Sequence, residues 1–240
     1  MNGKTSLQGS ELYENCHHTA ERRSNTRFFF GLLIVLWTIL FAVNCWHSAF
    51  GGVQVDGGSM LNTLKSGEYL LVRYFDEGDE LPYGSVIVVD VGHYPEVQEY
   101  NRQQREKNPK WVDTRYLIKR LIAKEGDKVR CKDGVLEVWY AGTDGYQVLN
   151  EPYAYYGGRP EKYDFAEYDV GEGEIFFLGD NRNISLDSRY KEGWSHIEGL
   201  YKESDIHGIV PTWAVEHKNT LAKIFFWREL LEEKLEKNKR

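Results

Sequence analysis

The sequence predicts a mainly β body behind a single transmembrane helix, and three observations support this fold class. Residues 28–50 carry no charged side chain, and as a helix they would be about 35 Å long, enough to cross a hydrocarbon core of about 30 Å. After Gly52, short apolar runs are separated by glycine, proline and acidic residues, which is the pattern of strands joined by turns. Aromatic residues make up 14% of the chain, and aromatic side chains are enriched in strands.

The composition limits the classes of function that the chain can serve. A length of 240 residues suits one substantial domain or two small ones, and a hydrophobic content of 41% suffices for a core. The net charge of −7 argues against nucleic acid as the main partner. The cysteines, Cys16, Cys45 and Cys131, are odd in number and widely spaced, so they predict no disulfide framework and no metal site. We also expect no cofactor.

The N-terminal region predicts an uncleaved membrane anchor and its orientation. Residues 1–27 are polar and are expected to form a disordered or loosely helical cytoplasmic tail. Arg22, Arg23 and Arg27 precede the apolar run, and the next lysine or arginine is Lys65. The positive-inside rule therefore puts the N-terminus in the cytoplasm and the body outside it. A secretory signal peptide would have a shorter apolar region and a clear Ala-x-Ala cleavage site.

The body is predicted as a series of strands with polar insertions. Asp133-Gly134 separates two of the apolar runs and is a strong signal for a two-residue hairpin. Residues 93–115 and 190–205 are polar and are expected to be solvated excursions, and the tyrosine-rich segment 151–169 is expected to be irregular. The expected strands are Tyr69–Phe75, Ser85–Asp90, a run around Tyr116–Arg120, Lys128–Lys132, Val135–Tyr140, Tyr146–Asn150, and His207–Val215.

The C-terminal residues 219–240 are expected to form a helical tail with Thr220 as its N-cap. The apolar cluster at residues 224–227 is too short to span a membrane. Contact with the membrane interface, packing on the body and fraying in solvent all remain open for this tail.

The segment Val55–Leu64 carries the first functional motif. Gly57 and Gly58 directly precede Ser59, and they allow a sharp turn that exposes backbone N–H groups beside the serine hydroxyl. By itself, such a segment also fits a solvated surface turn.

Two further motifs lie downstream of this turn. The second motif is a strand-like run that contains a lysine, Tyr116-Leu-Ile-Lys119-Arg120, and it is followed by Gly126-Asp127. The third motif is a dense polar loop, Gly179-Asp-Asn-Arg-Asn-Ile-Ser-Leu-Asp-Ser-Arg189. In this order, the three motifs resemble those of the bacterial type I signal peptidases. That family has a Ser-Met box, a Tyr-Ile-Lys-Arg box followed by Gly-Asp, and a Gly-Asp-Asn-Arg box that ends in Ser-Arg. The resemblance covers roughly residues 28–215.

The resemblance implies a membrane-bound serine endopeptidase that removes N-terminal signal peptides from exported preproteins. Its fold would be a mostly antiparallel β body over residues 51–218, with a small inserted β subdomain at about residues 130–172. Its partners would be signal peptides and the lipid bilayer, without nucleic acid. It would function as a monomer in the bacterial cell membrane.

The same resemblance implies roles for individual residues. Ser59 would be the nucleophile and Lys119 the general base. Ser185 would hydrogen-bond the lysine and help to orient it, and Met60 would contact the substrate. The residues that would support the site are Gly57 and Gly58, Arg120 paired with Asp180, and Asp187 paired with Arg189.

A lysine acts as a base only in surroundings that lower its pKa. A serine hydroxyl needs a neighbouring base, and a lysine amine is a base only when neutral, although its ordinary pKa is about 10.4. Burial among apolar groups disfavours the charged form, and a pKa of roughly 8 corresponds to about 3 kcal/mol. Strand alternation points Lys119 to the face opposite Ile118 and Arg120. The alternative is a lysine exposed on an edge strand.

The chain departs from the family pattern at two positions. Asn62 stands where the family usually has proline, which puts the rigidity of the loop after the nucleophile in doubt. Gly57 stands where many relatives have a serine whose hydroxyl can stabilise an oxyanion. We therefore expect the N–H of Gly57 or Gly58, or a polar group from another loop, to act together with the N–H of Ser59.

Other interpretations of the sequence remain open. A Ser-His-Asp triad would use His93, His196 or His207, none of which lies in a motif with an orienting acid. A sortase-like cysteine enzyme would use Cys131, which lies beside the Asp-Gly hairpin. A relative could bind signal peptides without cutting them. A self-cleaving repressor with a Ser-Lys dyad would need an N-terminal DNA-binding domain where the apolar run stands.

Overall fold

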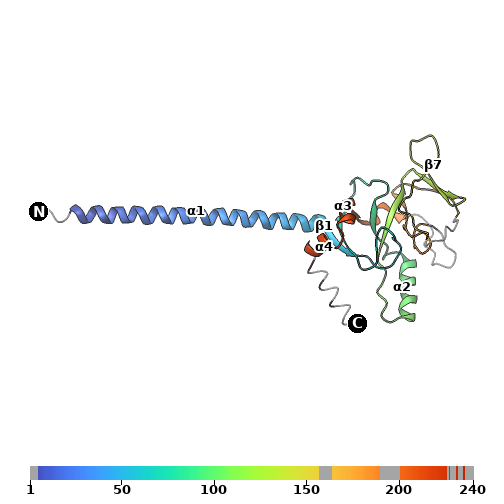
Figure 1. The fold of residues 1–240 in the computed structure, drawn as a ribbon, viewed down its shortest axis with the longest axis horizontal. Helices are drawn as coiled ribbons and strands as arrows, with labels where there is room; N and C mark the ends of the chain where they lie inside the picture. The colour runs from blue at the N-terminus through green and yellow to red at the C-terminus, as the bar shows by residue number, and fades with distance from the viewer. Residues whose placement is uncertain are drawn as a thin grey trace. The chain divides into compact units, whose positions relative to one another are not determined.

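The structure, a computed structural model, describes residues 5–156, 164–189 and 201–225, together with residues 227, 231 and 235. The chain divides into two compact units, Met1–Ala49 and Phe50–Arg240. Within the described residues, the first unit is a single helix and the second contains two β-sheets and short helices (Figure 1).

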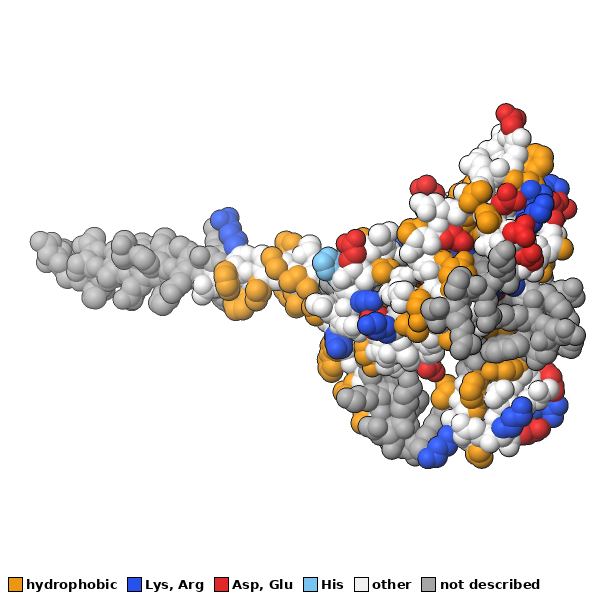
Figure 2. All heavy atoms as spheres, turned by 45° about the vertical axis from the view of Figure 1, so that its right-hand side comes forward, with side chains coloured by type: hydrophobic (Ala, Val, Ile, Leu, Met, Phe, Trp, Pro, Cys, Tyr) orange, Lys and Arg blue, Asp and Glu red, His pale blue; other side chains and the backbone are white. Residues whose placement is uncertain are grey.

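Helix α1 (Thr5–Ala49) contains the segment that is expected to cross the membrane. Residues Asn25–Ala49 of this helix have a mean hydropathy of 2.4 and are long and apolar enough to span a bilayer. Their large apolar side chains are exposed, as Figure 2 shows along the helix. The helix includes most of the polar N-terminal region, and Phe50, the expected last residue of the span, starts the first strand instead.

The main sheet has seven strands in the order β1-β2-β11-β3-β4-β9-β10, and all neighbouring strands are antiparallel. This arrangement confirms the predicted mainly β, mostly antiparallel fold class. The strands expected near residues 69, 85 and 116 are all present. The seven strands are β1 (Phe50–Gln54), β2 (Tyr69–Tyr74), β3 (Val86–Asp90), β4 (Tyr116–Lys124), β9 (Glu174–Leu178), β10 (Tyr201–Lys202) and β11 (Ile206–Val210).

A smaller sheet has four strands in the order β7-β6-β5-β8. Asp133 and Gly134 have φ angles of 52° and 75°, the left-handed pair that a two-residue hairpin turn uses, which confirms the predicted hairpin. The segment 151–169 is not wholly irregular, because it contains β8. The strands are β5 (Lys128–Lys132), β6 (Val135–Trp139), β7 (Gln147–Val148) and β8 (Phe165–Asp169).

The two sheets share a hydrophobic core. Phe176 and Leu178 of β9 pack with Val129 of β5 and with Leu136 and Val138 of β6. These five side chains are at most 2% exposed. The polar loop that follows β9 therefore starts from a strand that is held in the core.

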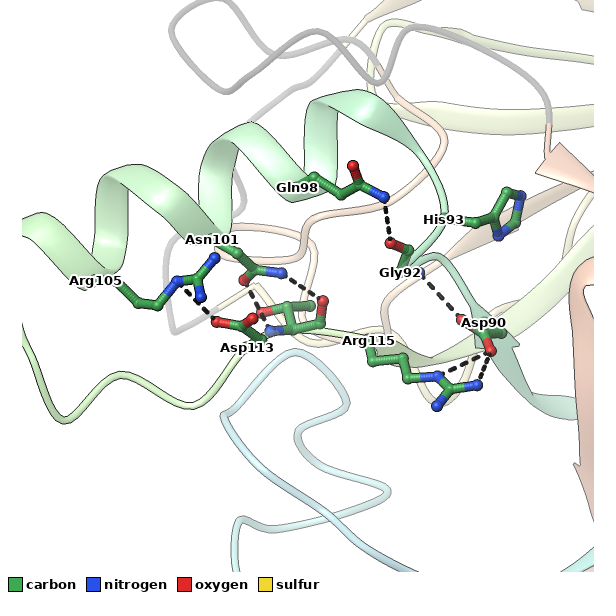
Figure 3. Close-up of a pocket in the computed structure, with 9 residues that line it drawn as sticks. Asp90, Gly92, His93, Gln98, Asn101, Arg105, Asp113 and Arg115 are labelled. Atoms are coloured by element: carbon green, nitrogen blue, oxygen red, sulfur yellow. Dashed lines mark hydrogen bonds and ion pairs between the residues drawn. The ribbon is translucent and has the colours of Figure 1, made fainter. Parts of the chain in front are cut away.

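Residues 93–115, expected to be a solvated excursion, contain helix α2 (Pro95–Lys107). Asn101 fastens this helix to the segment before β4, because its amide donates to the Thr114 carbonyl at 2.8 Å and its oxygen accepts the Thr114 N–H. Figure 3 shows the Asn101 side chain pointing from the helix toward that segment. Of the helix, only Val97 and Asn101 are buried, so its sequence lacks the apolar periodicity that usually marks a helix.

The last strand is shorter than predicted. The strand expected over His207–Val215 is β11, which ends at Val210. Pro211 follows and has no N–H for a further ladder bond. It precedes helix α3 (Thr212–Glu216), so the apolar residues Trp213 to Val215 are helical.

The C-terminal tail begins as a helix at the expected position. Helix α4 (Thr220–Phe225) starts with Thr220 as its first helical residue, whereas an N-cap would precede the helix. Of the insertion 190–205, residues 190–200 lie outside the described residues. Its last residues form β10 and a 3₁₀ turn (Glu203–Asp205).

Candidate active site

Ser59 lies in a turn that follows β1. The Val55 N–H donates to the Glu68 carbonyl at 2.8 Å, and the Gly67 N–H donates to the Val55 carbonyl at 2.8 Å, so the chain stays paired up to Val55. Gly57 then has a φ of 85°, which glycine adopts without strain. The chain turns sharply there, and Ser59 is left half-buried two residues later.

Lys119 reaches Ser59 from β4, across 60 positions of the sequence. Its Nζ lies 2.9 Å from Ser59 Oγ and also donates to the Ile118 carbonyl at 2.9 Å. The lysine is 2% exposed. Burial lowers the pKa of Lys119 to about 8, although the carboxylates of Asp187 and Asp180 act in the opposite direction. The amine is therefore neutral at mildly alkaline pH while it contacts the hydroxyl.

Arg120, on the opposite face of the strand from Lys119, forms the expected ion pair with Asp180. The guanidinium donates twice, from Nε to Oδ1 at 2.7 Å and from Nη2 to Oδ2 at 2.6 Å. It also donates to the Gly84 carbonyl, and the Thr63 hydroxyl donates to the carboxylate. The Asp180 side chain is fully buried. These bonds tie the loop after β9 to β4.

Asp187 and Arg189 form the second expected pair. The guanidinium donates to the two carboxylate oxygens at 2.8 and 2.9 Å, and the side chains are 1% and 5% exposed. Burial acts to raise the pKa of Asp187, but the Arg189 guanidinium and the Gly179 N–H outweigh it, so the pKa is lowered. The carboxylate stays charged, and its charge opposes the lowering of the lysine pKa.

Ser185 does not make the expected contact with Lys119. Its buried hydroxyl lies beside the Asp187 carboxylate, whose pKa it helps to lower, and the hydrogen bonds of the amine go elsewhere. Ser185 also packs over Gly179, because a Cβ built at Gly179 would lie 2.0 Å from Ser185 Oγ and 2.6 Å from the Ser59 carbonyl oxygen. A side chain at position 179 would therefore displace either Ser185 or the turn that contains Ser59. A role for Ser185 in orienting the lysine stays a prediction.

The backbone N–H groups of the turn around Ser59 differ in whether they already donate a hydrogen bond. The Gly57 N–H donates to Ser66 Oγ at 3.3 Å, so this N–H is already engaged. The N–H groups of Gly58 and Ser59 donate no hydrogen bond within the part of the chain that the structure describes. The positive φ of Gly57 also means that a serine at this position would be strained. We expected the N–H of either Gly57 or Gly58 to act with the Ser59 N–H as an oxyanion donor. Of these two, the structure therefore favours the Gly58 N–H.

The residues just after Ser59 lie in contrasting surroundings. Met60 is 1% exposed, so its side chain packs under the turn, and a packing role is favoured over the expected contact with substrate. Asn62 is exposed, and the Leu61–Asn62 peptide bond is cis.

A family model described as signal peptidase, peptidase S26, matches residues 29–214. The chain belongs to this family. It is 30% identical over 181 residues to signal peptidase I T of Bacillus subtilis (strain 168), which covers 75% of this chain and 83% of the relative. It is 30% identical over 155 residues to probable signal peptidase I-1 of Synechocystis sp., which covers 64% of this chain and 65% of the relative.

Among solved structures, a signal peptidase I from Enterococcus faecalis V583 matches with a TM-score of 0.36 and 22% identity, over 55% of this chain and 98% of that chain. The family membership confirms the resemblance seen in the three motifs. It makes the chain a serine peptidase that removes signal peptides.

The histidines considered for a catalytic triad have other contacts. His93 lies 3.4 Å from Asp205, and His207 packs against the ring of Tyr116 with ring centroids 4.9 Å apart. No hydrogen bond joins either histidine to the turn that contains Ser59 within the described residues. His196 lies outside them. The side chain that does lie within hydrogen-bond distance of Ser59 Oγ is Lys119.

Cys131 is unsuited to act as a thiolate nucleophile. It is 3% exposed in the shared core, and burial raises the pKa of its thiol to about 11. The sortase-like alternative is therefore not supported.

A polar pocket beside α2 involves neither Ser59 nor Lys119. Figure 3 shows that each arginine in it faces an aspartate: Arg115 lies 2.9 Å from Asp90, and Arg105 lies 3.4 Å from Asp113. Protein carboxylates thus neutralise both cations. Among the described residues, no cluster of histidine, cysteine and acidic side chains is arranged to hold a metal ion.

The motifs did not identify the residues that hold the polar loop from the side of the smaller sheet. Arg182 of that loop is fully buried and pairs with Glu151. The Tyr153 ring stacks on Arg120, with the guanidinium carbon 3.9 Å from the ring centre. Both partners come from a segment that was expected to be irregular. The signal in the sequence that could have indicated an acidic partner was Arg182 itself, because an arginine that becomes buried requires such a partner.

Proposed function

We propose that the chain is a membrane-anchored serine endopeptidase in which Ser59 is the nucleophile and neutral Lys119 is the general base. One observation carries the proposal: the buried amine lies 2.9 Å from the serine hydroxyl. A general base must be within hydrogen-bond reach of the proton that it takes, and it must be unprotonated at the working pH. The lysine pKa of about 8 supports the second requirement.

The proposed chemistry has two stages. In the first, Lys119 takes the hydroxyl proton while Ser59 Oγ adds to the scissile carbonyl carbon, and the oxyanion is met by the Ser59 N–H and the Gly58 N–H. The tetrahedral intermediate collapses, and the leaving amine takes the proton from the lysine ammonium. In the second stage, Lys119 deprotonates a water that attacks the acyl ester, and Oγ leaves and recovers its proton.

An unpaired strand edge beside the site supports an extended substrate. β3 pairs with β4 from Tyr116 to Arg120, whereas β9 pairs with β4 only from Arg120 to Lys124. Among the described strands, the Tyr116–Lys119 edge thus has no partner on the β9 side. A signal peptide added there as a strand would gain main-chain hydrogen bonds and would bring its scissile bond to Lys119. Small residues before the cut would suit shallow pockets and would give an Ala-x-Ala-like preference.

The apolar segment of α1 supports anchoring in the bacterial cytoplasmic membrane. Arg22, Arg23 and Arg27 precede it, which supports a cytoplasmic N-terminus and a body on the outer side. Residues 51–218 would form the catalytic domain, at the side where exported preproteins emerge. One copy of the chain supplies both members of the dyad, so a monomer would suffice.

Cleavage of a purified preprotein by the full chain in detergent tests this proposal. The wild type should release the signal peptide, and Ser59→Ala and Lys119→Ala should each lower the rate by about a thousandfold or more. The double variant should be scarcely slower, because the two residues act as a unit. Lys124→Ala is a matched control, since it removes a lysine of the same strand that contacts the Leu81 carbonyl.

Two results would contradict the proposal. A folded Lys119→Ala variant that keeps a tenth of the wild-type rate would exclude the lysine as the base. A wild-type chain that binds the signal peptide but leaves it intact would instead be a non-cleaving relative of the family.

A further inference from the structure

Asn181 contacts the turn that contains Gly58 and Ser59, here called the nucleophile turn, through both its backbone and its side chain. Its backbone N–H donates to the Ser59 carbonyl at 2.9 Å, and its side-chain Nδ2 donates to the Gly58 carbonyl at 3.0 Å. The residue is 4% exposed and lies 123 positions from Gly58 in the sequence. The loop after β9 thus holds the peptide units on both sides of the Ser59 Cα.

The bond to the Gly58 carbonyl fixes the direction of the Ser59 N–H. The two groups belong to the same peptide unit, which is planar and trans, so they point in opposite directions. Gly58, on one side of this unit, offers little steric resistance to its rotation, because glycine tolerates a wide range of backbone angles. The Asn181 amide therefore holds a peptide plane that the local sequence leaves free to turn.

We propose that Asn181 is a positioning residue that aims the Ser59 N–H at the oxyanion. This inference rests on the proposed function, in which that N–H is the first oxyanion donor. The N–H donates no hydrogen bond within the described residues, so it is available for this role. If the plane turned over, the Gly58 carbonyl oxygen would face the place where negative charge develops, and it would repel that charge.

Asn181 is itself held from several sides. Asp180, the residue before it, is fixed by Arg120, and the Tyr155 N–H donates to the Asp180 carbonyl at 2.7 Å. The Ser185 N–H donates to the Asn181 carbonyl at 3.2 Å. Because these bonds fix the backbone at residue 181, a change of its side chain should leave the loop in place.

The test compares Asn181→Ala with Asn183→Ala in the full chain. Asn183 lies in the same loop, and its Nδ2 donates to the Tyr156 carbonyl at 2.7 Å, away from the nucleophile turn. Each variant loses one side-chain donor bonded to a backbone carbonyl. Asn181→Ala should lower kcat for a signal-sequence peptide by about a hundredfold, with KM little changed. Asn183→Ala should keep kcat within about twofold of the wild type.

A peptide aldehyde separates aiming from general stability. Ser59 Oγ adds to the aldehyde carbon, the hydroxyl proton passes to Lys119, and the aldehyde oxygen becomes an oxyanion in the same place. Asn181→Ala should weaken aldehyde binding by about the same factor as kcat. In a Ser59→Ala background, it should leave binding of the uncleaved peptide unchanged. The midpoint of the pH profile, which reports Lys119, should not move.

Each outcome decides for or against the role of Asn181. An unchanged kcat in Asn181→Ala overturns it, and so does an equal loss of aldehyde and peptide binding, because that loss would be structural. If Asn181→Ala does not fold, Asn181→Leu replaces it with an apolar side chain of similar shape and keeps the backbone N–H. Failure of the wild type to cut the peptide would be a failure of the proposed function and not of this inference.

Discussion

Lys119 in the main sheet and Lys128 in the smaller sheet are both strand residues, yet their surroundings act on them in opposite ways. Lys128 is 40% exposed, and a hydrogen bond to Asp169 at 2.6 Å raises the pKa of its amine. Lys119 is buried, with no carboxylate among its hydrogen-bond partners in the described residues, and its pKa falls to about 8. Desolvation thus outweighs the more distant charges of Asp187 and Asp180.

Ion pairs on α2 and in the loop after β9 also differ in how far they are exposed to water. Arg102 and Glu99 on α2 lie 2.6 Å apart, with side chains 60% and 44% exposed, where water and salt screen them. Asp187 and Arg189 form a pair that is almost wholly excluded from water. Removal of either member of this pair breaks charge-assisted hydrogen bonds in a buried setting, which is strongly destabilising. The comparison shows that burial decides what a charged residue contributes, more than its type does.

The largest expected effect is on activity, from exchange of each lysine for arginine. Lys119→Arg should lower cleavage by about a thousandfold or more, because a guanidinium stays charged and cannot accept the serine proton. Lys128→Arg keeps a surface cation and should leave the rate within about twofold. A preprotein cleavage assay measures both. Equal losses in the two variants would remove the distinction between the lysines.

The next effect is on stability. Asp187→Asn removes the carboxylate that accepts two hydrogen bonds from the buried Arg189 guanidinium and should lower the free energy of unfolding by about 3–5 kcal/mol. Glu99→Gln on α2 should cause no measurable change, because its partner stays in water. Urea unfolding of the full chain in detergent compares the two. A similar small change in both would show that the buried pair is less isolated from water than its exposure indicates.

The smallest effect is a graded dependence on pH. In the proposed mechanism Lys119 must be neutral to act, so kcat/KM should rise about tenfold per pH unit below the pKa of about 8 and level off above it. The Lys128→Arg variant should show the same midpoint, because that amine does not take part. A flat profile between about pH 6 and 9 would exclude a titrating lysine with this pKa.

Elements that bury a continuous run of side chains could be predicted from the sequence, and the others could not. β3 is a nearly continuous apolar run and lies at the expected place, and β9 has the same apolar pattern. α2 buries only two side chains and β8 buries none, so neither carries a period that marks it. Tertiary contacts, and not the local sequence pattern, therefore determine the structure of both elements.

The sequence by itself determined the apolar segment that is long enough to span a membrane, the family, and the side chains of suitable chemistry: a serine after two glycines and a lysine inside an apolar run. Only the tertiary structure decided that these two meet at 2.9 Å, that burial lowers the lysine pKa, and that Asn181 holds the Gly58 carbonyl. These properties depend on groups 60 and 123 positions apart. Desolvation and hydrogen-bond geometry arise from packing in three dimensions, which no local stretch of sequence contains.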